Sequence, residues 1–177
     1  MYRLEKFQEE EIEQFISWIP DARFLLMSCG PIYKMASLKE QLLKDIEIAG
    51  KEYSDKKIFK VVDGEDNKVI GHIQLIRIDY ELKTAVIGRV VIGNPELRGK
   101  GIGSEVLNKL LKISFEEMGL ETIRLNVYDF NKRAMACYKK VGFIVEKIIE
   151  NASEFQEEKW TNIAMIFPKE RYENGYA

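Results

Sequence analysis

The spacing of hydrophobic residues predicts two helices near the start of the chain. A short strand over residues 2–7 precedes a helix from Glu9 to Trp18, in which apolar residues recur at intervals of three and four. The segment from Asp21 to Met35 is too apolar for a solvated linker, so we expect it to pack over another part of the molecule. A second helix follows Ser37, which stands three residues before Glu40, the spacing of a capping box.

Alternation with a period of two predicts strands from residue 57 onward. Ile58 to Val62, Val69 to Asp79 and Thr84 to Ile92 are separated by short polar turns, which predicts an antiparallel meander. A long amphipathic helix from Ile102 to Met118 and a strand from Thr122 to Tyr128 come next. The order strand, helix, strand predicts that the last two strands of this series are parallel, joined by a right-handed crossover.

The remaining chain predicts one more helix and a final pair of strands. The helix runs from Asn131 to Val141, and the strands, Phe143 to Ile149 and Lys159 to Phe167, flank an acidic connector, Glu150 to Glu158. The tail after Pro168 has no apolar periodicity. Because no repeat or domain boundary interrupts this order, we predict one α/β (α+β) domain over residues 1–177, with a mixed, mostly antiparallel sheet of about six or seven strands and about four helices.

Composition and charge exclude several classes of protein. A chain of 177 residues can bury a core without disulfide or metal support, and a formal net charge of −2 gives no general attraction for nucleic acid. No apolar run approaches the ~20 residues that span a bilayer, and the charged N-terminus is unlike a secretory signal. Cys29 and Cys137 lack metal-ligand spacing. We therefore expect a cytoplasmic protein with free thiols, no metal site and neither a nucleic acid nor a membrane as partner.

A glycine-rich loop joins the meander to the long helix. From Arg98 to Gly103 it reads Arg-Gly-Lys-Gly-Ile-Gly. Alternating glycines at a helix entrance let the backbone approach a ligand and leave several N–H groups free, which suits a phosphate or pyrophosphate. The alternative is an ordinary turn that caps a helix. The Walker pattern fails because Gly101 replaces its hydroxyl residue, and the dinucleotide pattern fails because Gly99, Gly101 and Gly103 have a different spacing.

A second motif downstream makes the loop more specific. Arg98-x-x-Gly101-x-Gly103 has the form R/Q-x-x-G-x-G/A, and the later segment reads Asn131-x-x-Ala134-x-x-x-Tyr138-x-x-x-Gly142-Phe143. Together these motifs closely resemble the GCN5-related N-acetyltransferase (GNAT) superfamily, whose element order agrees with nearly the whole chain. The N-terminal strand, the helix ending at Trp18 and the late strand beginning at Trp160 look most like the branch that contains ribosomal-protein N-terminal and spermidine acetyltransferases. The resemblance implies a GNAT fold with two splayed central strands.

The resemblance also implies an acetyl-CoA site. In the family the loop amides take the pyrophosphate, and the bulged strand before the loop bonds the pantetheine arm and offers an N–H to the thioester carbonyl. Asn131 matches an asparagine that bonds pantetheine, although it is also a natural N-cap for the helix it begins. The implied cofactor residues are Val90, Val91, Ile92, Leu97, Arg98, Gly99, Lys100, Gly101, Ile102, Gly103, Ser104, Asn126, Asn131 and Tyr138.

Tyr138 is the implied catalytic residue. It matches a tyrosine that family members place near the CoA sulfur, where its phenol can protonate the departing thiolate; the alternative is a packed helix tyrosine. The general base stays open, because Asn126 stands where relatives often carry a glutamate and cannot titrate. Asp129, Asp79 and Glu81 are candidates only by their proximity in the chain to strand ends, and a water chain to solvent is equally consistent. His72, on a strand of the meander, is interpreted as structural.

The resemblance implies that the acceptor site is formed by the segment between the first two helices and by the connector of the last strand pair. Trp18, Tyr33 and Tyr128 are the candidate substrate-binding residues, and Phe24 is a further candidate for an apolar or cation-binding wall. The connector acids Glu150, Glu154, Glu157 and Glu158 are candidates for attracting a cationic amine. Core packing and a solvated loop are the respective alternatives. The leading hypothesis is an acetyl-CoA-dependent N-acetyltransferase acting on a small amine, a polyamine or a protein N-terminus, and a homodimer is the candidate assembly. The alternatives are a non-catalytic acyl-CoA-binding or sensing module and a scaffold without cofactor.

Overall fold

The computed structural model describes residues 1–176, so Ala177, the last residue of the predicted domain, lies outside the described residues. The elements follow one another in the order β1 (Tyr2–Lys6), α1 (Ile12–Ser17), α2 (Ala22–Cys29), α3 (Leu38–Ala49), β2 (Lys56–Asp63), β3 (Val69–Asp79), β4 (Thr84–Ile92), α4 (Ile102–Lys112), β5 (Thr122–Tyr128), α5 (Lys132–Val141), β6 (Ile144–Phe155), β7 (Glu158–Pro168) and α6 (Lys169–Glu173).

One seven-stranded sheet connects these elements in the order β1-β2-β3-β4-β5-β7-β6. Among the described residues, only β4 and β5 are parallel, and every other neighbouring pair is antiparallel. The predicted meander, the parallel pair and the mostly antiparallel sheet are therefore confirmed. The crossover between the parallel strands contains α4, as the strand, helix, strand order predicts.

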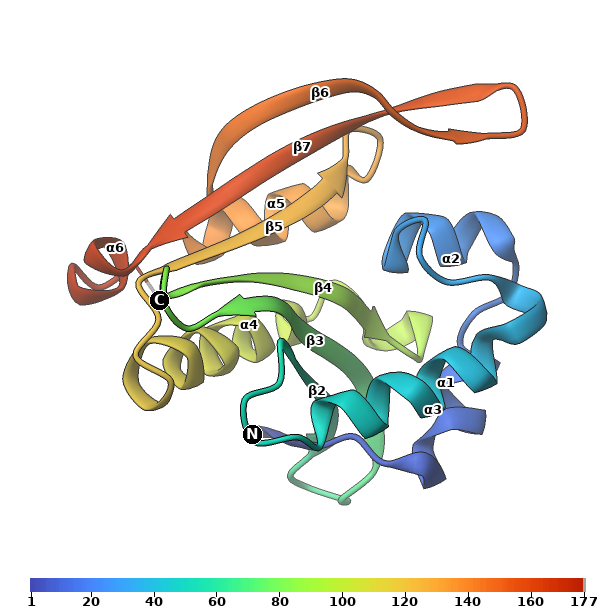
Figure 1. Ribbon diagram of the computed structural model, residues 1–177, viewed down its shortest axis with the longest axis horizontal. Coiled ribbons are helices and arrows are strands. Elements are labelled where there is room, and N and C mark those ends of the chain that lie inside the picture. Colours follow the sequence, from blue (N-terminus) through green and yellow to red (C-terminus); the bar gives the residue numbers. More distant parts are fainter. Residues whose placement is uncertain (177) are drawn as a thin grey trace.

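The two central strands separate halfway along their length. Thr84–Ile87 of β4 pairs with Thr122–Leu125 of β5, but β4 continues to Ile92 and β5 to Tyr128 without further pairing to each other. Figure 1 shows the two strands diverging toward the end of the sheet where α2 and the β6–β7 hairpin lie. The opening leaves backbone groups of both strands available to a ligand.

A β-bulge in β4 lies at the start of this opening. Gln74 of β3 pairs with Gly88 and His72 pairs with Val91, so Ile73 faces two residues of β4 instead of one. Arg89, one of those two, has φ of 55°, an uncommon conformation for a residue other than glycine. The extra residue reverses the alternation: Ile87 packs in the cluster that contains α4, whereas Val91 packs in the cluster that contains α1 and α3.

Helices cover both faces of the sheet and create two hydrophobic clusters. On one face α4 and α5 pack against the central strands, with Val106, Leu107 and Leu110 fully buried. On the other face α1, α2 and α3 pack on the meander, with Phe15 and Leu42 fully buried. In Figure 1 the sheet runs between these two groups of helices. The core therefore fixes α4, whose first turn follows the glycine loop, to the middle of the sheet.

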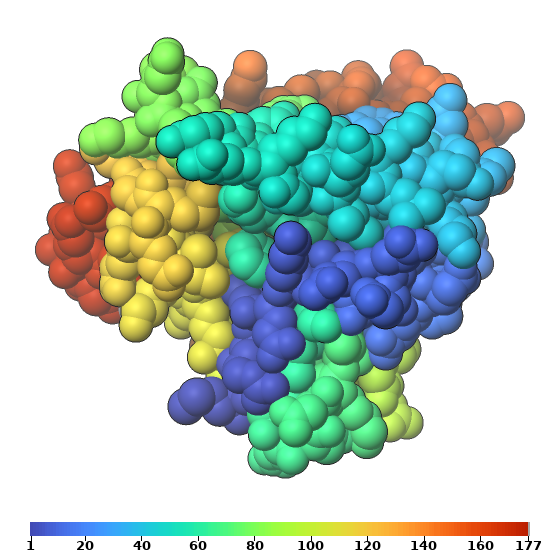
Figure 2. Space-filling model, turned by 60° about the horizontal axis from the view of Figure 1, so that its bottom comes forward, coloured from blue at the N-terminus to red at the C-terminus, as the bar shows by residue number. Residues whose placement is uncertain are grey.

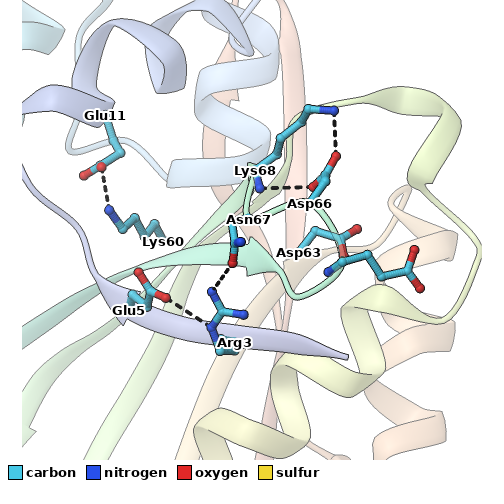
Figure 3. Close-up of polar contacts among 9 residues, drawn as sticks. Arg3, Glu5, Glu11, Lys60, Asp63, Asp66, Asn67 and Lys68 are labelled. Atoms are coloured by element: carbon cyan, nitrogen blue, oxygen red, sulfur yellow. Dashed lines mark hydrogen bonds and ion pairs between the residues drawn. The ribbon is translucent and has the colours of Figure 1, made fainter.

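Polar contacts attach the edge strand β1 to its surroundings. The Tyr2 backbone N–H donates to Glu105 Oε1 of α4 at 3.0 Å. Figure 3 shows the Arg3 guanidinium donating to Asn67 Oδ1 in the β2–β3 turn at 2.8 Å, and Lys60 paired with Glu11 at 2.6 Å. Figure 2 shows the N-terminal segment (dark blue) on the surface beside this turn (green). These contacts connect α4 and α1 to the same edge of the sheet.

Five local predictions differ from the structure. The apolar segment after Asp21 forms a helix, α2, because the Asp21 side chain accepts from the Phe24 N–H and caps it. The prediction of a capping box at Ser37 is wrong. The Ser37 hydroxyl accepts a hydrogen bond from the side-chain amide of Gln41, and a 3₁₀ turn precedes α3.

The other three differences lie after the glycine loop. The helix predicted to reach Met118 ends as an α-helix at Lys112 and continues as one π-helical turn, Ile113–Glu117. The prediction of an acidic connector over Glu150 to Glu158 is wrong, because most of this segment belongs to paired strands. The strand β6 extends to Phe155, which lies opposite Glu158 at the start of β7. The tail after Pro168 forms the short helix α6, so the helices outnumber the predicted four.

His72 makes the stability of the fold depend on pH. It is fully buried, with its ring centroid 4.6 Å from that of Phe7 and 4.4 Å from that of Phe15. Burial, and to a smaller extent the charge of Arg89, lowers the pKa of His72 to about 3. Between that value and the ordinary 6.5, the unfolded chain binds a proton that the folded chain does not, so stability is lost as the pH falls. We expect His72 to remove about 2 kcal/mol of unfolding free energy between pH 7 and pH 5.

Denaturant unfolding of the wild type and of His72→Gln at both pH values measures this contribution. The variant cannot titrate at this position, so its loss between pH 7 and pH 5 should be smaller by about 2 kcal/mol. Equal losses in the two proteins would show that His72 does not control the acid sensitivity.

Within residues 1–176 the structure contains no helix that is both long and apolar enough to cross a membrane.

Candidate functional site

A cavity of about 550 Å³ occupies the opening between β4 and β5. The end of β4, the glycine loop, the first turn of α4 and one side of α5 form its walls. It is lined by every predicted cofactor residue except Lys100, namely Val90, Val91, Ile92, Leu97, Arg98, Gly99, Gly101, Ile102, Gly103, Ser104, Asn126, Asn131 and Tyr138. The structure therefore brings together two motifs that are far apart in the sequence. Lys100 is exposed and does not line the cavity.

The glycine loop adopts a backbone that other residues rarely adopt. Gly99 and Gly101 have φ of 87° and 86°, and Gly101 is the N-cap residue of α4. Gly103 has a different role, because a Cβ there would lie 3.2 Å from Cys137 Sγ of α5. The first N–H groups of a helix have no partner within it, so the start of α4 directs unpaired donors and its dipole at the loop. This geometry suits an anionic group such as a pyrophosphate.

Two arginines, Arg98 and Arg133, lie beside the loop. Arg98 donates to the carbonyls of Ile92 and Gly93, at 2.9 and 3.3 Å, which holds the loop against the end of β4. A Cβ added at Gly99 would lie 3.1 Å from the Arg133 guanidinium, so Arg133 lies directly over the loop. Burial, together with the nearby charge of Arg133, lowers the pKa of Arg98. An anion beside these side chains would relieve their repulsion, so the loop fits the pyrophosphate of a CoA thioester.

The helix α5 supplies the other predicted cofactor residues. Asn131 is its N-cap, and the side-chain oxygen accepts from the Ala134 N–H at 3.2 Å. Asn131 also lines the cavity, so capping leaves it in reach of a ligand. Tyr138 is 9% exposed and its ring packs edge-to-face with Phe143. Burial raises the pKa of the Tyr138 phenol, so it remains protonated at neutral pH.

A second cavity, of about 420 Å³, lies between α2, β4, β5 and the β6–β7 hairpin. Both cavities are lined by Gly88 and Arg89 of β4, by Asn126 and Val127 of β5 and by Ser28 of α2. The two spaces thus meet where the central strands part. Arg23 of α2 pairs with Glu158 of β7 at 2.8 Å and connects α2 to the hairpin beside the second cavity.

The three predicted substrate residues occupy different positions. Tyr128 lines the second cavity, where its hydroxyl is 2.7 Å from Ser153 Oγ. Trp18 lines neither cavity and packs on the backbone of Gly93, where a Cβ would lie 2.2 Å from the indole ring. Tyr33 lines neither cavity: its hydroxyl donates to Asp45, and the Arg89 guanidinium lies 4.6 Å above its ring.

None of the carboxylates predicted as bases or as amine attractants within residues 1–176 lines either cavity. Asp79 accepts from the backbone N–H groups of Glu81 and Leu82 and thereby stabilises a turn. Within residues 1–176, no Asp, Glu or His lines either cavity. Asn126, in the position where relatives often carry a glutamate, accepts from Asn162 of β7 at 3.1 Å.

Several lining residues escaped the sequence reasoning. These are Arg133 and Lys140 of α5 and Met27 and Ser28 of α2, which line the first cavity. Phe24 of α2, a candidate for the acceptor wall, lines the first cavity and not the second. Arg133 follows Asn131 by two residues, so its position within the second motif could have indicated a contact with an anionic ligand. Met27 and Ser28 carried no such signal, because only the tertiary packing of α2 against β4 brings them to the cavity.

Comparison with known proteins agrees with this geometry. Residues 12–143 match the model of the acetyltransferase (GNAT) family. The chain is 34% identical over 86 residues to spermidine N(1)-acetyltransferase of Vibrio cholerae serotype O1, covering 49% of each protein. It is 28% identical over 152 residues to acetyltransferase PseH of Campylobacter jejuni, covering 82% of this chain and 86% of PseH. The matched segment thus spans about half the length of the V. cholerae enzyme.

The fold of a solved relative is also similar. Spermidine N-acetyltransferase from Vibrio cholerae, solved in complex with CoA and spermine, superimposes with a TM-score of 0.80 at 24% identity and covers 98% of both chains. The family match over residues 12–143, the splayed strands and the glycine loop at the start of α4 lead to one conclusion: the chain belongs to the GNAT acetyltransferase family.

Proposed function

We propose that this protein transfers an acetyl group from acetyl-CoA directly to the primary amine of an acceptor. The observation that carries the proposal is the meeting of two cavities at Gly88 and Asn126, one of them ending at the glycine loop. The first cavity suits a CoA thioester, and the second is a separate space from which an amine can approach. A small amine, a polyamine and a protein N-terminus are the classes of acceptor considered.

The residues around the first cavity have distinct roles in this proposal. Bound acetyl-CoA supplies an activated acetyl group as a thioester. The N–H groups at the start of α4 and the guanidinium of Arg133 hold the pyrophosphate, and Asn131 bonds the pantetheine arm. The bulged end of β4 offers backbone N–H groups to the thioester carbonyl, which stabilise negative charge on its oxygen. The Tyr138 phenol donates its proton to the sulfur that leaves.

The amine acceptor loses its proton to solvent in this account. An amine is mostly ammonium at neutral pH and must lose a proton before it attacks. Since no Asp, Glu or His within residues 1–176 lines either cavity, water in the open second cavity takes the proton. The same observation favours one alternative function, an acyl-CoA-binding or sensing module that lacks turnover.

Release of free thiol from acetyl-CoA, measured with a panel of amines, tests the proposal. We expect release that depends on at least one amine and exceeds hydrolysis without amine. Release at the hydrolysis rate with every amine would contradict transferase activity. If acetyl-CoA then still raised the thermal unfolding midpoint, the binding module would replace the enzyme, because a ligand that binds only the native state stabilises it.

We also propose a homodimer formed through β6. Within residues 1–176 this strand is an edge of the sheet and pairs only with β7, and it exposes Ile144, Val145, Ile148 and Ile149 by 44%, 46%, 60% and 37%. A second copy would pair with the edge and cover these side chains. Light scattering after size exclusion should give a dimer for the wild type and a monomer for Ile148→Lys. A wild-type monomer, or a dimer that Ile148→Lys leaves intact, would contradict this interface.

A cytoplasmic location completes the proposal. Cys29 and Cys137 are free thiols, as is usual in a reducing compartment. Cell fractionation should recover the protein with cytoplasmic markers, and recovery in a membrane or secreted fraction would contradict this location.

A further inference from the structure

Arg89 lies where the two cavities meet, and its side chain is buried. It lines both cavities but is only 5% exposed. The bulge in β4 directs it to the face of the sheet that α1, α2 and α3 cover, where the guanidinium carbon lies 4.6 Å above the ring of Tyr33. The contact is a cation–π interaction, which attracts the guanidinium but gives its N–H groups no acceptor.

The charge of Arg89 has no carboxylate to balance it within residues 1–176. Its Nε and Nη1 are buried without a hydrogen-bond partner. The acid bonded to the same Tyr33, Asp45, is already paired with Lys56. Two other buried polar atoms, His72 Nδ1 and Gln74 Oε1, also lack partners on this face of the sheet. A buried cation without a partner is costly, so an arginine in this state indicates a negatively charged partner from outside the chain.

The second cavity has the same imbalance of charge. Arg77 and Arg89 are the only charged residues that line it within the described chain, and both are positive. A polyamine carries only cationic groups, so it would meet two arginines and no carboxylate. An acceptor that carries an anionic group near its amine would instead be attracted.

We propose that the acceptor is a small amine that also carries a carboxylate, and that the guanidinium of Arg89 binds this carboxylate. The inference rests on the proposed transferase function and names the substrate class of that site. The planar guanidinium matches a carboxylate with two parallel N–H···O bonds, which lysine cannot reproduce. Binding of the carboxylate at the junction of the cavities would hold the neighbouring amine at the place where the thioester lies.

Matched pairs of amines that differ only by a carboxylate test this inference. The pairs are alanine with ethylamine, ornithine with putrescine and lysine with cadaverine, and the measurement is kcat/KM with saturating acetyl-CoA. In at least one pair we expect the wild type to prefer the carboxylate-bearing member about 10-fold or more, the usual range for a charged hydrogen bond. In Arg89→Met this preference should fall to about 1, and Arg89→Lys should restore only part of it. Arg124→Met, which removes a guanidinium that is paired with Glu146 and lines neither cavity, should keep the full preference.

Each result separates the two proposals. Hydrolysis-level release with every amine of every pair would contradict the transferase function itself. Turnover that is equal or faster with the decarboxylated amines would overturn only the carboxylate inference. A wild-type preference that Arg89→Met retains would overturn the role of Arg89. If Arg89→Met does not fold, two measurements on the wild type test the inference: the ratio of kcat/KM within each pair of amines, and competitive inhibition by propionate against the amine. If the wild type shows neither a preference for the carboxylate-bearing amine nor inhibition by propionate, the inference is overturned.

Discussion

Tyr138→Phe lowers kcat for amine acetylation about 10-fold or more and changes the affinity for acetyl-CoA little. The substitution removes one hydroxyl from a buried ring that packs on Phe143 and leaves the packing of α5 intact. The lost function is proton donation to the leaving sulfur, and general acid catalysis is typically worth this much or more. Steady-state kinetics with calorimetric binding of CoA measures the two effects separately.

The Tyr138 prediction has a matched control and a dependence on pH. Tyr172→Phe removes a phenol that bonds to Glu116 on the surface, and kcat should stay unchanged. Because burial raises the pKa of Tyr138, the wild type should keep its proton donor into the alkaline range instead of losing it as the pH rises past neutrality. A Tyr138→Phe enzyme with the wild-type kcat would remove this residue from the mechanism and leave the alternative of a packed core tyrosine.

Gly101→Val weakens acetyl-CoA binding by about 10-fold to 100-fold. Gly101 has φ of 86° and caps α4, and a β-branched residue in this conformation is strained by about 1–3 kcal/mol. The space around Gly101 is open, so the effect comes from the backbone and not from a clash. The loop must then leave the conformation that directs its N–H groups at the pyrophosphate, and calorimetric titration with CoA should record the loss.

Gly119→Val is the matched control for the loop. Gly119 also has positive φ, 66°, and open space around it, but it lies after α4 and away from both cavities. The two variants should lose similar unfolding free energy, while only Gly101→Val should lose affinity. Equal affinities in both variants and the wild type would show that the loop conformation does not bind the cofactor.

The central strands and the glycine loop were predictable because burial imposes a pattern on them. The bounds Thr84–Ile92 and Thr122–Tyr128 agree with the sequence prediction, since both strands lie in the middle of the sheet with alternating burial. Glycines at positive φ mark the loop (Gly101), the end of the π-helical turn that follows α4 (Gly119) and the end of α5 (Gly142). The motif from Asn131 to Phe143 then placed α5 beside the loop.

Elements outside the core were less predictable for a physical reason. The hairpin of β6 and β7 extends beyond the core, so its connector is exposed on both sides and shows no apolar alternation. The helix α2 packs against β4 on one side and lies near the β6–β7 hairpin on another. Its apolar residues therefore do not recur on a single face, and the sequence pattern did not predict a helix there. The π-helical turn at Ile113–Glu117 has no local signal in the sequence.

The acceptor side of the site depended most on tertiary structure. Aromatic residues alone did not distinguish Tyr128, which lines the second cavity, from Trp18 and Tyr33, which pack elsewhere. Arg89 was visible in the sequence as the charged residue of its strand, but its burial and its missing partners follow from the bulge. A one-residue bulge decides which face of a sheet a side chain occupies, and such a shift is not encoded in alternation.

A crystal structure of the protein with CoA tests the central claim most directly, because the claim concerns where the thioester and the acceptor meet. We predict the pyrophosphate on the backbone N–H groups of Gly99 to Ser104, with Arg133 against it, and the sulfur between β4 and β5 beside Tyr138. A pyrophosphate bound elsewhere, or a sulfur outside the opening between the two strands, would contradict the account.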